Sequence, residues 1–147
     1  MIQFFSKLFQ SVSTTTSDSS TSSEDKMNAN HLSAMSRHVT QNHGTEPAFS
    51  SPLNSNKKTG SYNCIVCNTP VFSSEHKFDS GTGWPSFYRP AKTENIASKT
   101  DYEIGYPRTE VHCAKCQAHF GHVFNDGPQP TGLRYCINGA ALNFVAK

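Results

Sequence analysis

The chain has 147 residues, a length that suits a single domain with one modest hydrophobic core. Hydrophobic residues make up only 35% of the sequence, so part of the chain is predicted to lie outside that core. The formal charge of +2 comes without a run of Lys and Arg, which disfavours binding to a nucleic-acid backbone. No apolar stretch approaches the roughly 20 residues that span a bilayer, so no membrane role is expected.

Residues 1–30 begin with a short apolar stretch at 1–9 and continue with a tract in which Ser or Thr occupies almost every position from 11 to 23. Such a tract cannot bury enough apolar surface to offset its conformational entropy, and we predict a disordered tail. A transit peptide is the alternative, because the tract has no acidic residue before Asp18, although it lacks Arg. Lys7 interrupts the short apolar start, so we do not expect secretion, and both cytoplasm and mitochondrion stay open.

Residues 31–147 are predicted to form the folded domain. A short helix is expected at 32–41, and from Tyr62 onward short strands alternate with turns rich in Gly, Pro, Asn and Asp. The predicted strands are 102–106, 108–113, 132–137 and 140–145. The expected fold is mainly β, with two small antiparallel sheets packed together and one or two short N-terminal helices.

Four of the five cysteines form two CxxC pairs, which are Cys64 with Cys67 and Cys113 with Cys116. Each pair presents two thiolates at a spacing that suits a metal, and folding can bring two such pairs around one tetrahedral zinc ion. Disulfide bonds are the alternative, but they would need an oxidising compartment. The sequence therefore predicts one structural Zn²⁺ held by these four residues.

The fifth cysteine lies in a predicted strand with polar neighbours. Side chains alternate between the faces of a strand, so Arg134, Cys136 and Asn138 are expected on the face opposite the apolar residues. A neighbouring guanidinium would lower the pKa of Cys136 and favour its reactive thiolate form. A buried cysteine that acts as a small hydrophobic residue is the alternative. From the residues alone, the two interpretations are equally supported.

Two histidines and one tryptophan are further candidates. His119 and His122 follow the second CxxC pair and alternate with apolar residues that include Phe124, a pattern typical of a pocket wall. Trp84, the only tryptophan, follows a Gly-rich turn that could hold its ring at a surface, where a thioether or methyl group would pack against it. A purely structural role is the alternative for each of the three.

Together these segments resemble the B-type methionine sulfoxide reductases, which act on the R epimer at sulfur. The matching stretches follow the family order from about residue 38 to the C-terminus. They are GTEP at 44–47, CxxC at 64–67, FDSGTGWPSF at 78–87, RTEV at 108–111, CxxC at 113–116, AHFGHVF at 118–124, DGP at 126–128 and PTGLRYCIN at 130–138.

The resemblance implies that residues 31–147 reduce methionine sulfoxide in oxidised proteins, with Cys136 attacking the sulfur and becoming a sulfenic acid. It implies that His119, His122 and Asn138 bind and protonate the sulfoxide oxygen. The resemblance further implies that Asp126 orients a histidine, that Arg134 tunes the thiolate, and that Trp84 and Phe124 bind the substrate. Acid catalysis is required because the sulfoxide oxygen leaves poorly until it is protonated.

One position departs from the family in a way that affects the mechanism. Many members carry a second redox cysteine in the SGxGWPSF loop, where this chain has Thr82. Because the other four cysteines are assigned to zinc, an external thiol is expected to reduce the Cys136 sulfenic acid. Thioredoxin is the first candidate, and glutathione or glutaredoxin is the rival. A monomer is expected.

Two other classes of protein compete with an enzyme. A zinc-containing binding module would explain the four metal cysteines but leaves the polar face around Cys136 without a purpose. A nucleic-acid-binding zinc ribbon is disfavoured by the near-neutral charge.

Overall fold

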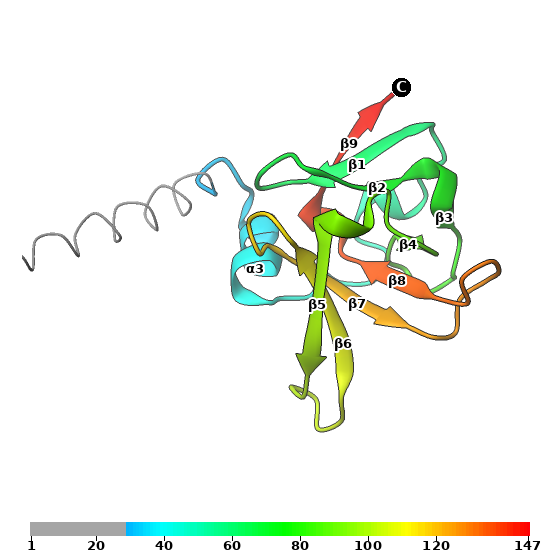
Figure 1. The fold of residues 1–147 in the computed structure, drawn as a ribbon. Helices are drawn as coiled ribbons and strands as arrows, with labels where there is room; N and C mark the ends of the chain where they lie inside the picture. Colours follow the sequence, from blue (N-terminus) through cyan, green and yellow to red (C-terminus); the bar gives the residue numbers. More distant parts are fainter. Residues whose placement is uncertain (1–28) are drawn as a thin grey trace, which may run out of the picture. The chain divides into compact units, whose positions relative to one another are not determined.

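The computed structural model describes residues 29–147, and the compact unit discussed below is Leu32–Lys147 (Figure 1). The predicted disordered tail lies outside the described residues except for positions 29 and 30. Among the described residues, no helix combines the length and the apolar character needed to cross a bilayer.

The one α-helix in the described part of the chain is α3, Ala34–Asn42, close to the predicted range of 32–41. Ser33 caps its N-terminus by accepting a hydrogen bond from the Ser36 backbone amide. His43 ends it in a left-handed conformation with φ of 55°. Val39 is fully buried, so the helix packs one face against the sheets.

A three-stranded antiparallel sheet has the order β2-β1-β9. Its strands are β1 (Gly60–Cys64), β2 (Pro70–Ser73) and β9 (Leu142–Ala146). The C-terminal strand thus pairs with the first strand of the domain, which closes the fold.

A six-stranded antiparallel sheet has the order β3-β4-β8-β7-β6-β5. Its strands are β3 (Lys77–Phe78), β4 (Ser86–Phe87), β5 (Ile96–Asp101), β6 (Arg108–Cys113), β7 (His119–Phe124) and β8 (Arg134–Ile137). Short 3-10 turns at Pro52–Asn54, Ser74–His76, Thr93–Asn95 and Gly139–Ala141 complete the connections. The prediction of a mainly β fold with two antiparallel sheets and a short helix is confirmed.

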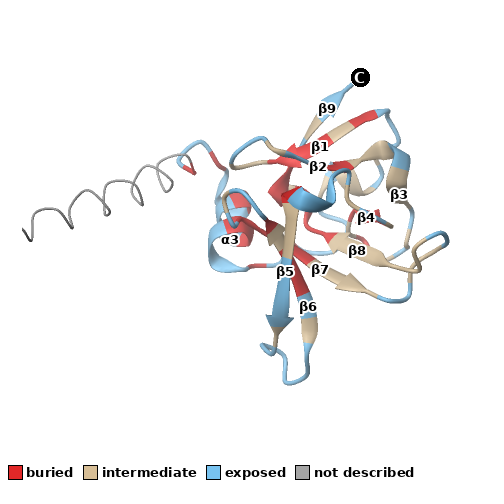
Figure 2. Ribbon diagram, viewed as in Figure 1, coloured by how far each residue is buried: buried red, intermediate tan, exposed pale blue. Residues whose placement is uncertain are grey.

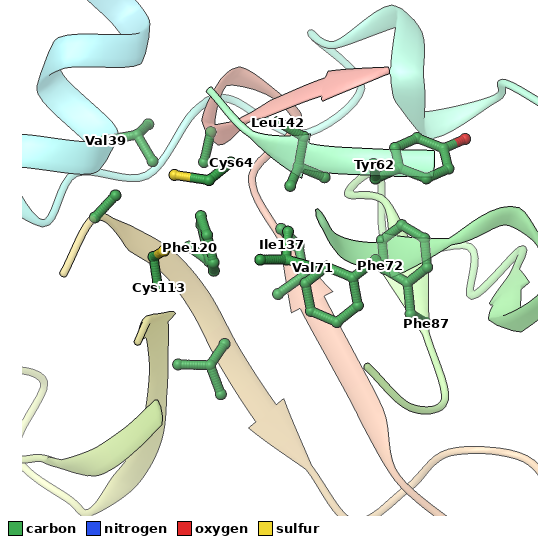
Figure 3. Close-up of a cluster of buried hydrophobic side chains, with 13 residues drawn as sticks. Val39, Tyr62, Cys64, Val71, Phe72, Phe87, Cys113, Phe120, Ile137 and Leu142 are labelled. Atoms are coloured by element: carbon green, nitrogen blue, oxygen red, sulfur yellow. The ribbon is translucent and has the colours of Figure 1, made fainter. Parts of the chain in front are cut away.

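The hydrophobic core receives side chains from both sheets and from α3 (Figures 2 and 3). Phe72 of the small sheet stacks on Phe87 of the large sheet with ring centroids 4.5 Å apart, and Tyr62 meets Phe87 edge-on at 5.1 Å. Such aromatic pairs add to the hydrophobic gain of burial. Cys64 and Cys113 lie at one end of this core, so the cysteine turns are continuous with it.

Three of the four predicted strands are present, with shifted ends, and one is wrong. The 108–113 prediction matches β6, while 132–137 and 140–145 correspond to the shorter β8 and the shifted β9. The segment 102–106 is instead the turn between β5 and β6. Gly105 has φ of 92° there, and its amide donates to the Tyr102 carbonyl, which reverses the chain.

Gly121 brings β7 and β8 unusually close together. It lies opposite Ile137, and a Cβ at this position would collide with the backbone carbonyl of Cys136. Backbone cannot move aside as the end of a flexible side chain can, so only glycine fits here. The close approach fixes the part of β8 that carries Cys136.

Candidate active site

Cross-strand pairing in the large sheet assembles a row of polar side chains on one face. Cys136 on β8 lies opposite His122 on β7, and His122 lies opposite Glu110 on β6. On its other side, Cys136 lies opposite Ser86 on β4. Directly paired residues of antiparallel strands point to the same face, so these four side chains are neighbours. The row places a thiol beside an imidazole.

Arg134 shares this face, as the alternation along the strand predicts. It lies opposite Phe124, and its guanidinium carbon is 4.5 Å from the centroid of that ring. Its Nε and Nη2 donate to the two carboxylate oxygens of Asp126 at 2.9 and 3.2 Å. Arg134 thereby lowers the pKa of Asp126. Asp126 thus contacts Arg134 in the structure, and the expectation that it orients a histidine stays a prediction.

Cys136 is partly buried, and its titration differs from the expectation. Burial raises the pKa of the thiol, because the charged form loses solvation. The Arg134 guanidinium and a hydrogen bond with the Thr82 side chain act in the opposite direction without overcoming burial. The predicted effect of Arg134 has the correct sign, but the free thiol stays harder to ionise than an exposed cysteine.

His119 is buried and hydrogen-bonded to a carboxylate from the neighbouring strand. Its Nδ1 lies 2.8 Å from Oε2 of Glu110, and Nδ1 of His43 lies 3.4 Å from the same oxygen. Burial lowers the pKa of His119, while the Glu110 carboxylate partly offsets this effect. Burial alone would raise the pKa of Glu110, but His119, His43 and Lys99 together hold it below its usual value. The geometry favours a neutral imidazole with a fixed orientation.

His122 is held in the same way by a different carboxylate. Its Nε2 lies 2.9 Å from Oδ2 of Asp101, and the same oxygen accepts a hydrogen bond from Nη2 of Arg108 at 3.2 Å. The hydrogen bond from His122 and another from the Glu103 backbone amide lower the pKa of Asp101 to about 2. Asp101 is thus an anion that fixes the histidine paired with Cys136.

Asn138 lies just beyond β8 and is directed into a buried network. Its Oδ1 accepts from the backbone amide of Glu46 at 2.8 Å, and its Nδ2 donates to the Phe120 carbonyl at 2.9 Å. Both polar atoms of the amide are therefore bonded to backbone groups. Asn138 thereby links the Glu46 and Phe120 backbones, and the expectation that it binds the sulfoxide oxygen stays a prediction.

Glu46 is the centre of that network and is not among the residues predicted for the site. Its carboxylate accepts from the backbone amides of Gly139 and Ala140 at 3.0 and 2.7 Å, and its side chain is almost fully buried. Burial raises the pKa of Glu46, although both amides oppose the shift. Glu46 therefore fastens the turn that follows β8.

Trp84 is oriented by the same segment. Its Nε1 donates to the backbone carbonyl of Glu46 at 3.0 Å, and its side chain is only partly buried. The next residue, Pro85, accepts a hydrogen bond from the Ile137 amide at 2.9 Å. The loop with the tryptophan is thus bound to the strand with Cys136, and the ring is not a core side chain.

A cavity of about 780 Å³ opens beside the two histidines. His119, His122, Asp101 and Glu110 contribute to its wall, together with the end of α3 and the turn after β5. Phe124 lines a separate cavity of about 350 Å³. Cys136 and Trp84 line neither of these two cavities.

The four CxxC cysteines come together as predicted. Their sulfur atoms all lie within 4.8 Å of one another, and the Cys64–Cys116 and Cys67–Cys113 pairs are each 3.6 Å apart. Both turns have the same backbone form. Asn68 and Gln117 adopt φ of 63° and 67°, and their amides donate to the carbonyls of Cys64 and Cys113. This four-sulfur cluster can hold a metal ion.

Comparison with known proteins identifies the family. The SelR domain model matches residues 32–146. The chain belongs to the SelR family. It is also 54% identical over 115 residues to a protein named peptide methionine sulfoxide reductase MsrB from two strains of Escherichia coli, O139:H28 and K12 DH10B. Each alignment covers 78% of this chain and 84% of the relative. The resemblance drawn from the motifs is confirmed, and with it the prediction of an oxidoreductase.

In this SelR domain, Cys136 has no second cysteine beside it. Thr82 lies on the Cys136 side of the Gly-rich loop, where it is hydrogen-bonded to Cys136 and to Ser80, with 2.8 Å between the Thr82 and Ser80 oxygens. The other four cysteines are grouped in the metal cluster. The hydroxyl of Thr82 therefore lies beside Cys136, in the loop where many related proteins have a second redox cysteine.

Sequence reasoning missed the two carboxylates that hold the histidines. Glu110 belongs to the quoted RTEV stretch, and a polar residue in the middle of a buried strand could have drawn attention to it. Asp101 is the last residue of β5, whereas the sequence predicted a strand at 102–106. The sequence pattern therefore gave no indication of its role. Pairing of histidines with carboxylates depends on sheet register, which the local pattern does not reveal.

Replacing Glu110 with Gln should lower the pKa of His119 further. The substitution keeps the shape of the side chain but removes the negative charge that favours the protonated ring, while burial remains. The pH titration of the imidazole ¹³C and ¹⁵N chemical shifts would measure this. Asp126→Asn is the control, since its carboxylate faces Arg134, and it should leave the His119 titration unchanged. If the pKa of His119 changed in Asp126→Asn but not in Glu110→Gln, the pairing of His119 with Glu110 would be contradicted.

Proposed function

We propose that this SelR domain reduces the R epimer of methionine sulfoxide in oxidised proteins to methionine, with Cys136 as the nucleophile. The row that places Cys136 between His122 and Ser86, beside two histidines held by carboxylates, carries the proposal. The printed name of the Escherichia coli relatives, peptide methionine sulfoxide reductase, supports the substrate class.

The reaction transfers the sulfoxide oxygen to the enzyme. The Cys136 thiolate attacks the substrate sulfur and forms a sulfur–sulfur bond, while the sulfoxide oxygen accepts a proton. The protonated oxygen then passes from the substrate sulfur to the Cys136 sulfur as the sulfur–sulfur bond breaks. Methionine is released with its sulfur reduced by two electrons. Cys136 is oxidised by two electrons and carries the oxygen as a sulfenic acid. One thiol proton is therefore needed on the oxygen, and no other reactant enters this step.

The histidines supply the route for that proton. Each ring has one nitrogen on a carboxylate, Nδ1 of His119 on Glu110 and Nε2 of His122 on Asp101. The other nitrogen of each ring is free of that carboxylate and can exchange a proton with Cys136 or the sulfoxide oxygen. Because burial raises the pKa of Cys136, a nearby neutral base is needed to take its proton at neutral pH.

Two aromatic side chains bind the substrate in this proposal. The ring of Trp84 is partly exposed and held by its Nε1, so it can pack against the methyl group on sulfur. Phe124 adjoins the Arg134 guanidinium on the same face as Cys136. The epimers differ in which substituent meets the ring and which meets the proton donors, and only the R epimer presents its oxygen to the histidines.

The sulfenic acid is reduced by an external thiol. Thr82 stands where a loop cysteine would act, and the remaining cysteines belong to the four-sulfur cluster. Thioredoxin is the proposed reductant, and glutathione or glutaredoxin is the alternative thiol donor.

The four-sulfur cluster holds one structural Zn²⁺ in this proposal. The donor set fits, because four thiolates from two CxxC turns match the tetrahedral preference of zinc. All four positions are taken by protein ligands, so the metal has no open position for substrate. Its contribution is to join the β1–β2 turn to the β6–β7 turn and thus to fix the strand that carries both histidines.

Turnover by purified, reduced protein is the direct test of the activity. With dithiothreitol, a peptide R-sulfoxide should be converted to methionine while the S epimer is not, as measured by chiral chromatography. Cys136→Ser should lower kcat at least about 10³-fold, because the hydroxyl is a far weaker nucleophile. Cys67→Ser provides no control, since it alters the metal cluster. Ser98→Cys, on the exposed strand β5, tests whether any thiol suffices and should not restore turnover to the Cys136→Ser protein.

Metal content should separate the two kinds of cysteine. Mass spectrometry is expected to find about one zinc per chain. Cys113→Ser should lose the metal together with stability on the order of the whole folding free energy, about 5–15 kcal/mol. Cys136→Ser should keep both the zinc and the melting temperature. Full metal occupancy in the Cys113→Ser protein would rule out the four-cysteine site.

Thr82→Cys should convert the enzyme to a disulfide-forming mechanism. In the unaltered protein, one equivalent of substrate without reductant should leave a Cys136 sulfenic acid that dimedone traps. In the variant, the introduced thiol replaces a hydroxyl bonded to Cys136, so the sulfenic acid should condense to a disulfide within the chain. Thr100→Cys, on β5, is the matched control and should still yield the dimedone adduct. Detection of a Cys136–Cys64 or Cys136–Cys67 disulfide in the unaltered protein would overturn the external-thiol proposal.

A further inference from the structure

The turn between β5 and β6 carries a cluster of exposed apolar side chains. Tyr102, Ile104 and Tyr106 are 70%, 49% and 60% exposed, and they lie within five residues of one another. Three other large apolar residues are exposed in the described part of the chain, and they are scattered: Met35, Phe49 and Val145. Single exposed apolar residues are ordinary, but a cluster indicates a binding surface. In Figure 2 this turn is exposed along with the outer half of β5.

The turn extends from the body of the domain and is held at its base (Figure 1). Oδ1 of Asp101 accepts a hydrogen bond from the Glu103 amide at 2.8 Å, and the Gly105 amide donates to the Tyr102 carbonyl at 3.1 Å. Oδ2 of Asp101 is the atom that holds His122. One carboxylate therefore anchors both the turn and a proposed catalytic group, so the turn has a defined position relative to the site.

The same turn borders both of the cavities described above. Tyr102 and Ile104 line the cavity of about 780 Å³ that also contains His119 and His122. Tyr106 lines the cavity of about 350 Å³ that contains Phe124. A polypeptide bound in either of these two cavities would contact the turn.

We propose that residues 102–106 form a docking surface for the unfolded, apolar polypeptide segment that flanks an oxidised methionine. This inference rests on the proposed reductase function and names the substrate it prefers. Methionine is mostly buried in folded proteins, so its sequence neighbours are often apolar and become accessible when the protein unfolds. The edge strand β5 lies three strand spacings, roughly 14 Å, from the strand β8 that carries Cys136, and about four extended residues span that distance. Free methionine sulfoxide is too small to reach the turn.

The test compares substrates with and without flanking residues. The triple variant Tyr102→Ser/Ile104→Ser/Tyr106→Ser and the unaltered protein are assayed with three R-sulfoxides. These are N-acetylmethionine sulfoxide amide, a heptapeptide with Leu and Phe flanks, and a heptapeptide with Gly and Ser flanks. We expect the variant to lose about 5- to 30-fold in kcat/KM on the apolar peptide, through KM. The other two substrates should change less than about twofold.

Matched controls separate a lost contact from a damaged fold. Met35→Ser/Val145→Ser removes exposed apolar surface away from the turn and should leave all three substrates unaffected. Ile104→Ser alone should give part of the loss on the apolar peptide. An equal loss of the triple variant on all substrates, or no loss on the apolar peptide, would overturn the docking surface. If the unaltered protein turns over no R-sulfoxide, the proposed function fails, and the docking inference falls with it.

Discussion

Four sulfur atoms, two from each sheet, converge to within 4.8 Å, and much of the molecule depends on how they are held there. Thiolates at this separation repel one another strongly, so the cluster requires a cation or protonation to persist. Our proposal of zinc meets that requirement. The cluster ends β6 at Cys113, and β7 begins three residues after Cys116. Glu110 and His119 therefore sit close to a cross-linked point, where the backbone has little freedom to separate the imidazole from its carboxylate.

The register of the large sheet determines which charged side chains lie next to each other in the site. His119 and His122 each face their own carboxylate, and Asp126, the one acid of the predicted site, is paired with Arg134. This arrangement explains why the Arg134 charge fails to offset burial at Cys136, since a guanidinium already paired with a carboxylate has less influence on a thiol. The raised pKa of Cys136 favours its protonated form, which is less reactive than the thiolate.

Features of the site that depend on the spacing of nearby residues could be predicted from the sequence. The CxxC turns and the shared face of Arg134 and Cys136 follow from residue spacing alone, and the structure has both. The 102–106 strand was wrong because aromatic residues favour strands, whereas Gly105 and the Asp101 side chain dictate a turn. The partner of Asp126 is Arg134, only eight residues away, but the pair depends on how the connection between β7 and β8 folds back. The partners of Asn138 could not be predicted, because the tertiary fold brings distant segments together. The Asn138 partner Glu46 is 92 residues away in sequence.

Asp101 shows how specificity and catalysis can share one group. It ends the edge strand β5, holds His122 and Arg108 through one oxygen, and fixes the exposed turn through the other. Its ionised form is strongly favoured, with a pKa of about 2, so the carboxylate that makes these contacts stays charged at neutral pH. A polypeptide that displaced the turn would also strain the His122 hydrogen bond. A polypeptide that fitted the turn as it stands would leave the imidazole aligned with Cys136, and the docking surface would then favour substrates that preserve the catalytic geometry.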